Sequence, residues 1–250
     1  ALGLVMAIPG AFFTWRWLPH YRYLRELLDQ NPLGRLYHCA FSFRMKNGGK
    51  LDYAWRFDRK RANGALGDMG AHMFDLARYL VGDIVRVNGR LATHVKRNGV
   101  DGQPLDPAND AANAWVEFAN GAIGTIDMSS VDRTLDASGT QQRVVLQGEA
   151  ASIVADFGFA GGVRLQIAKG HGSYEPIPIP ERYLAGMDAS QPFWDQFLAM
   201  LARQPVGNRL FVDGIVNNTP IVPSLYEGLK AQQVIDAVNA SHASGTSAMV

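Results

Sequence analysis

The sequence predicts an α+β fold, in which helices pack on one face of an open-faced, predominantly antiparallel sheet. Three observations predict it. Strand-like alternation of apolar and polar residues dominates the chain between Val87 and Ala168, helical periodicity occurs before and after that region, and hairpin signals separate successive strands. At 250 residues with 47% hydrophobic content, the chain is expected to form a single globular body.

The first third of the chain predicts strand, helix and strand in turn. The apolar run Leu4 to Ile8 ends at Pro9 and favours a short buried parallel strand. Pro19 is expected to open a helix that ends near Gln30, with Tyr21, Leu24 and Leu28 on its buried stripe and His20 on its surface. Residues Tyr37 to Met45 alternate and predict a half-buried strand that contains Cys39.

The middle of the chain predicts six further strands. The pair Asn120 and Gly121 is a strong hairpin signal, and Gly148 with Glu149 indicates a second hairpin. The predicted strands are Val87 to Val95, Trp115 to Phe118, Ile123 to Met128, Arg143 to Gln147, Ala151 to Ala155 and Val163 to Ala168.

The last third predicts one extended connection and two helices. Three prolines between Lys169 and Arg182 predict an extended segment without a regular ladder. Helices are expected at about Gln191 to Ala202 and Ser224 to Ala243, and in the second Ser224 and Glu227 form a capping box.

Charge and composition exclude several classes of protein. The 24 Lys and Arg are balanced by 23 Asp and Glu without blocks of one sign, so neither nucleic acid nor a membrane surface is an expected partner. No apolar run approaches the roughly 20 residues that span a bilayer. The chain starts without Met or a basic n-region, which indicates a cut end and not a secretory signal, and a cytoplasmic location is expected. The single cysteine, Cys39, is expected to be a buried structural thiol.

The segment from Asn63 to Asp83 carries the sharpest candidate for chemistry. Its helix is expected to run from about Asp68 to Gly82, with an apolar stripe of Met69, Met73, Leu76 and Leu80. Asp68 and His72 lie one turn apart on the adjacent stripe, which also holds Asp75 and Tyr79. A histidine beside a carboxylate can act as a general base, so Asp68 and His72 are the predicted catalytic residues.

Two other interpretations of this pair remain open. It can be a solvated or structurally hydrogen-bonded pair. It can also supply two ligands to a metal. Because no second cluster of Asp, Glu or His at short spacing supplies further ligands, no metal is predicted.

Two aromatic and basic clusters are candidates for substrate binding. One is Trp15, Arg16 and Trp17, and the other is Trp55 with Arg56. Aromatic faces and planar guanidinium groups suit polyhydroxylated ligands, although tryptophan in a core or hinge is as common. Arg16, Trp55 and Arg56 are the predicted substrate-binding residues.

No G-x-G-x-x-G turn occurs in the sequence, so no dinucleotide-binding half can be placed in these residues. The residues that would hold a nucleotide are therefore unassigned, and tight binding of NAD or NADP by this chain alone is not expected.

The segment NGALGDMGAHMFD, Asn63 to Asp75, resembles the G-G-x-L-x-D-x-G-x-H-x-x-D segment of the glucose-fructose oxidoreductase and inositol dehydrogenase (Gfo/Idh/MocA) family, with Asn63 in place of the first glycine. The upstream stretch TWRWLPHYRYLRELLDQNPLGRLYH is similar to the start of the family's C-terminal domain, with Arg16, Pro19 and Gly34 in register. The segment SLYEGLKAQQVIDAVNASHASG resembles its closing helix.

The resemblance implies a Rossmann domain ahead of this region. Residues 1–18 would then be the remnant of its end, and residues 19–250 the substrate-binding, catalytic and oligomerisation domain. It implies that His72 accepts the substrate's hydroxyl proton and that Asp68 supports it, whereas the catalytic Lys of the family's E-K-P motif is absent from this sequence. It also implies NAD or NADP in the complete protein, a sugar or polyol substrate, and a dimer or tetramer formed through the open sheet face. Trp115 and Ile123, beside the predicted hairpin, lie outside the predicted core stripe and add apolar residues to that face.

The favoured interpretation is the substrate-binding and catalytic portion of an NAD(P)-dependent oxidoreductase acting on a sugar, polyol or related carbinol. The alternative is a catalytically silent sugar-binding or oligomerisation module of the same fold, and a third is metal-dependent hydrolysis. The presence of both Asp68 and His72 favours the enzyme.

Overall fold

The computed structural model describes residues 11–46, 53–133 and 139–250. The strand predicted at Leu4 to Ile8 lies outside the described residues.

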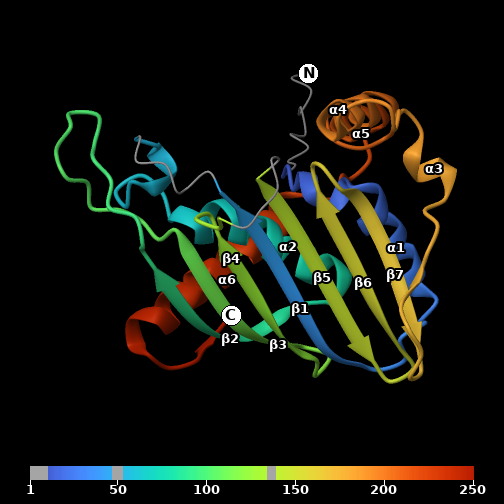
Figure 1. The fold of residues 1–250 in the computed structure, drawn as a ribbon, viewed down its shortest axis with the longest axis horizontal. Coiled ribbons are helices and arrows are strands. Elements are labelled where there is room, and N and C mark those ends of the chain that lie inside the picture. The colour runs from blue at the N-terminus through green and yellow to red at the C-terminus, as the bar shows by residue number, and fades with distance from the viewer. Residues whose placement is uncertain (1–10, 47–52, 134–138) are drawn as a thin grey trace, which may run out of the picture.

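The described part of the chain is built on a nine-stranded sheet in the order β8-β7-β6-β5-β1-β4-β3-β2-β9 (Figure 1). The strands are β1 (Leu36–Met45), β2 (Ile84–Ala92), β3 (Ala111–Phe118), β4 (Ile123–Ser129), β5 (Thr140–Gly148), β6 (Ala151–Gly158), β7 (Gly162–Lys169), β8 (Glu175–Pro176) and β9 (Ala248–Met249). Only β1 and β4 pair in parallel among these strands, and every other neighbouring pair is antiparallel. The predicted hairpins are confirmed as β3–β4 and β5–β6.

Helices cover one face of the sheet and leave the other open, which confirms the predicted fold class (Figure 1). Behind the sheet, α1 packs against β7, α2 against β1, and α6 against β2. Helices α4 and α5 lie together beyond one end of the sheet. The helices are α1 (Pro19–Asp29), α2 (Ala71–Leu80), α3 (Glu181–Leu184), α4 (Phe193–Arg203), α5 (Asn208–Asn217) and α6 (Leu225–Ser244).

The core lies between the helices and the sheet, because alternate strand residues turn their side chains to the same face. Cys39, Phe41 and Phe43 of β1 are buried on that side, and Cys39 is the buried free thiol that the sequence predicts. The apolar stripe predicted for α2 is confirmed, since all four of its members are buried: Met69, Met73, Leu76 and Leu80.

The C-terminal third contains elements that the sequence pattern did not predict. The proline-rich connection forms the two-residue strand β8, which contradicts the expectation of no ladder; it pairs with β7 at the sheet edge, where proline is tolerated. Helix α5 was not predicted either; only Gly214 of this helix is buried, so it has no buried apolar stripe that a sequence pattern could show. By contrast, α4 and α6 lie close to their predicted bounds, and the capping box of Ser224 and Glu227 is confirmed.

The expectation that His20 lies on a helix surface is wrong. Its side chain is fully buried, with its ring centroid 3.9 Å from that of Tyr21. The N-terminal turn of α1 is buried around a wider arc than its apolar stripe indicates, because Trp17, Leu18 and Pro19 are buried as well. No helix in the described ranges combines the length and hydropathy that crossing a bilayer requires.

Candidate active site

The predicted catalytic segment begins with a wider helical turn. Residues Leu66–Gly70 form a π-helix, labelled η4, which leads directly into α2. The helical conformation therefore starts before Asp68, the residue at which the sequence pattern placed the helix start. Such π turns are rare and are frequent at functional sites. Here the turn carries Asp68, and His72 follows in the first turn of α2.

His72 lies against two aromatic side chains from the segment before α1. The ring centroids of Phe13 and Trp15 lie 6.0 and 6.1 Å from that of His72, and both rings meet it edge-on. Trp15 belongs to the 3₁₀ helix η1 (Thr14–Trp17) and also packs against Phe43 of β1 at 5.7 Å. Two distant parts of the chain thus enclose the imidazole.

The surroundings of His72 disfavour its protonated form. Its Nδ1 atom is buried and has no hydrogen-bond partner among the described residues. Burial lowers the pKa of His72 from 6.5 to about 4, and the negative charge of Asp68 opposes this shift. The imidazole is therefore neutral at pH 7, which is the form that can accept a proton.

Asp68 lies at the exposed edge of the same site and contacts a predicted substrate-binding residue. Its Oδ1 accepts a hydrogen bond from Nε of Arg56 at 3.1 Å, and its side chain is 39% exposed. The Arg56 guanidinium lies 4.7 Å from the ring centroid of Trp55, which is itself half exposed. Trp55 and Arg56 belong to the 3₁₀ helix η3 (Trp55–Phe57). The structure therefore brings four of the predicted residues into one group: Trp55, Arg56, Asp68 and His72.

Arg16 has a different environment from the other predicted substrate-binding residues. It is buried, and it pairs with Asp75 through two hydrogen bonds, Nε to Oδ2 at 2.8 Å and Nη2 to Oδ1. Its guanidinium also lies 4.6 Å from the ring centroid of Tyr79. Burial raises the pKa of Asp75 to about 6, against the hydrogen bonds from Arg16. The geometry joins Arg16 to Asp75 and Tyr79 of α2 and gives it a structural contact.

Sequence reasoning missed the two aromatic contacts of His72. Trp15 belongs to the predicted aromatic and basic cluster, but only Arg16 of that cluster was predicted to bind substrate. Nothing in the sequence singles out Phe13. Only the course of η1 shows which side chains of this segment face His72.

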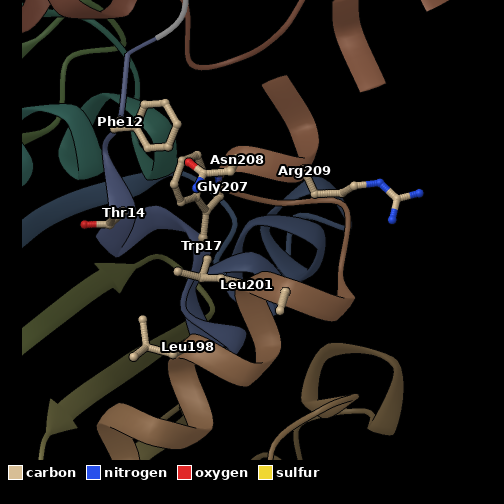
Figure 2. Close-up of a pocket in the computed structure, with 9 residues that line it drawn as sticks. Phe12, Thr14, Trp17, Leu198, Leu201, Gly207, Asn208 and Arg209 are labelled. Atoms are coloured by element: carbon tan, nitrogen blue, oxygen red, sulfur yellow. The ribbon is translucent and has the colours of Figure 1, made fainter. Parts of the chain in front are cut away.

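A cavity of about 440 Å³ lies between η1 and α4 (Figure 2). Phe12 and Trp17 border it from the η1 side and Leu198 and Leu201 from α4, while the Arg209 side chain points away from it in Figure 2. None of the predicted site residues lines this cavity. Within the described ranges, no group of three or more His, Cys, Asp or Glu side chains is arranged to hold a metal ion.

A family model that matches more than half of the chain shows the family to which the chain belongs. Residues 21–154 match the family model described as the GFO/IDH/MocA C-terminal domain. This chain belongs to the Gfo/Idh/MocA family. The match includes the π turn and α2, so the resemblance on which the residues Asn63 to Asp75 were aligned is confirmed at the family level.

Several relatives of this Gfo/Idh/MocA chain are named dehydrogenases. Levoglucosan dehydrogenase of Pseudarthrobacter phenanthrenivorans is 29% identical over 177 residues, which is 62% of this chain and 43% of that protein. Inositol 2-dehydrogenase of Rhizobium meliloti is 24% identical over 228 residues, 90% of this chain and 60% of that protein. The chain thus spans less than two thirds of the length of these relatives.

Solved structures show the same fold. The structure of levoglucosan dehydrogenase in complex with NADH and levoglucosan matches 97% of this chain with a TM-score of 0.83 at 22% identity, and the match covers 66% of that protein. Action on inositol or on a sugar is a property of those relatives.

Proposed function

We propose that this chain is the substrate-binding and catalytic portion of an NAD(P)-dependent oxidoreductase that acts on a sugar, a polyol or a related carbinol. The observation that carries the proposal is the group formed by His72, Asp68, Arg56 and Trp55. It combines a neutral, partly buried imidazole with an exposed carboxylate, a guanidinium and an aromatic face.

Each member of the group has a chemical task in this proposal. The neutral imidazole of His72 accepts the hydroxyl proton of the carbinol. The charge of Asp68 favours the imidazolium that forms and so opposes the low pKa that burial imposes. Arg56 and Trp55 offer hydrogen-bond donors and an apolar ring face to a polyhydroxylated substrate.

The two electrons of the carbinol C–H bond leave as hydride, for which a nicotinamide nucleotide supplies the acceptor. When the hydroxyl proton moves to His72 at the same stage, the product is a neutral carbonyl group. The sequence holds no phosphate-binding glycine turn, so this group of residues is assigned to the substrate, and none of them is assigned to the phosphates of the nucleotide.

The test is His72→Ala in the complete protein, with turnover of sugars and polyols measured with both NAD and NADP. We expect kcat to fall by at least about 100-fold, because a positioned general base contributes about 100- to 10,000-fold. The melting temperature and the affinity for the nucleotide should change little. His94→Ala, at an exposed position, is the control and should keep its activity.

Asp68→Asn provides an independent measurement. It removes the charge that raises the pKa of His72, so the acid limb of the kcat profile should move to lower pH, and kcat should fall less than in His72→Ala. Full activity of the His72→Ala protein with its true substrate would remove this residue from the mechanism. Absence of turnover in the unmodified complete protein, with sugar binding retained, would favour the silent sugar-binding module.

A further inference from the structure

Asn109 lies directly against the turn that carries Asp68. Its side chain is 8% exposed. Its amide oxygen accepts a hydrogen bond from the backbone N–H of Leu66 at 2.9 Å, and its amide nitrogen donates to the carbonyl of Asn63 at 2.6 Å. One side chain therefore fixes both the lead-in to the π turn and the first residue of that turn.

The backbones of the same two segments are also in direct contact. The N–H of Ala65 donates to the carbonyl of Asn109 at 2.9 Å. Gly64 has a φ of +61°, and a Cβ atom at this position would collide with the Asn109 carbonyl oxygen. Glycine permits both the left-handed backbone and the close approach of the two chains.

The π turn depends on an external partner for its first N–H group. The first N–H groups of a helix have no acceptor within the helix. No side chain at the N-terminal residue Ala65 caps η4, and Asn109 supplies the acceptor for Leu66. Since Asp68 is the third residue of this turn, the point at which the turn begins determines where its carboxylate lies.

The residues next to Asn109 in the sequence also contact the segment that carries Arg56. The N–H of Ala108 donates to the carbonyl of Phe57 at 2.8 Å. Arg97 pairs with Asp110 at 3.3 Å in a fully buried ion pair, and its guanidinium lies 4.0 Å from the ring centroid of Phe57. Both partners of the Arg56 ion pair are thus supported from one short stretch of chain, residues 108–110.

We propose that Asn109 is a positioning residue for Asp68: by bridging Leu66 N–H and the Asn63 carbonyl it fixes the π turn and holds the carboxylate beside His72. This inference rests on the proposed function, in which Asp68 supports His72. Asn109 itself makes no contact with the reacting groups.

The test measures the electrostatic coupling between Asp68 and His72 in the 250-residue chain. Nuclear magnetic resonance of ¹⁵N-labelled histidine follows the titration of His72 from pH 8 to pH 2.5, because its pKa lies near 4. A unit charge about 6 Å away changes a pKa by about half a unit even when it is screened by water alone. We expect Asp68→Asn to lower the pKa of His72 by about this amount or more. In a chain that also carries Asn109→Ala, the same substitution should lower the pKa of His72 by less than about half of that shift.

Asn120→Ala is the matched control. The Asn120 amide also accepts from a backbone N–H, that of Ala122 at 3.0 Å, and donates to a backbone carbonyl, that of Val81 at 3.0 Å. Because this residue lies in the β3–β4 turn, its loss should leave the full effect of Asp68→Asn on His72.

If the Asn109→Ala chain does not fold, Asn109→Gln replaces it, because the extra methylene moves the amide away from Leu66 and Asn63; it should also lose at least about half of the coupling. Full coupling in either folded variant would overturn the proposal. The titration requires no turnover, so its outcome is independent of whether the complete protein proves to be a dehydrogenase.

Discussion

The imidazole of His20 is enclosed without a hydrogen-bond partner for either ring nitrogen among the described residues. Burial lowers its pKa from 6.5 to about 3. The unfolded chain therefore binds a proton below pH 6.5 that the folded chain does not accept until about pH 3. The free energy of unfolding must fall as the pH decreases through this interval. His72, with a pKa of about 4, acts in the same direction.

We expect His20→Leu to weaken this acid sensitivity. At pH 5 the single proton costs the wild-type chain about 2 kcal/mol of stability relative to pH 7. The leucine chain should lack that contribution, and urea unfolding at the two pH values measures it. His94→Leu, at an exposed position, is the control. An unchanged pH dependence in His20→Leu would show that the buried imidazole is protonated in the folded state.

The buried ion pair of Arg16 and Asp75 leads to a prediction about stability. Removing one partner of a buried ion pair leaves the other charge without compensation and costs about 3–5 kcal/mol. We expect Arg16→Met to lose stability of this order at pH 7, and Arg16→Met combined with Asp75→Leu to recover most of it. Thermal and urea unfolding test both. A double variant no more stable than the single one would contradict the structural contact assigned to Arg16.

At the scale of elements, the parallel pairing of β1 and β4 depends on a glycine. Gly124 faces Cys39, and a Cβ atom at Gly124 would lie 2.6 Å from the Cys39 carbonyl oxygen. We expect Gly124→Ala to destabilise the chain by about 1–3 kcal/mol, because the two central strands must move apart. The control is Gly161→Ala, whose Cβ would meet nothing within 4 Å. Equal melting temperatures for the two variants would contradict this prediction.

Elements with a strong local pattern could be predicted from the sequence. The β3–β4 turn, with Asn120 and Gly121, and the capping box at Ser224 depend on neighbours in the chain, and both are present. The parallel pairing of β1 with β4 and the short strand β9 depend on residues far apart in the sequence, which no local pattern records.

The same distinction applies to the candidate site. The spacing of Asp68 and His72 predicted one helical face because the two residues lie close together in the sequence, and η4 and α2 form one continuous helical segment. The π turn, the approach of Phe13 and Trp15, and the inward turn of Arg16 all come from packing between separate elements. The roles of the predicted site residues in catalysis and substrate binding remain predictions.

At the scale of the whole molecule, the described residues expose apolar side chains on more than one surface. On the open face of the sheet, Trp115 and Ile123 are 37% and 41% exposed. A second group of exposed apolar side chains lies on α5: Val212, Ile215 and Val216. An open antiparallel sheet face can be solvated or buried against a partner. We propose that this face pairs two copies of the chain, as predicted from the sequence.

Light scattering at tens of micromolar tests the pairing. We expect a dimer or tetramer that dissociates in Ile123→Lys, because a charge would be buried at the contact. Ile215→Lys is the matched control and should leave the oligomer intact. A strict monomer, or dissociation by Ile215→Lys alone, would contradict the assignment to the sheet face.

The central place of β1 also bears on the order in which the molecule is assembled during synthesis. Leu36 of β1 pairs with Gly148 of β5, and the other edge of β1 pairs with β4. Both edges of this early strand must therefore remain unpaired on the ribosome until the middle of the chain has emerged. Pairings between residues so distant in sequence slow folding, and unpaired apolar strands are prone to aggregate. The nascent chain is thus expected to need protection by chaperones until β5 is complete.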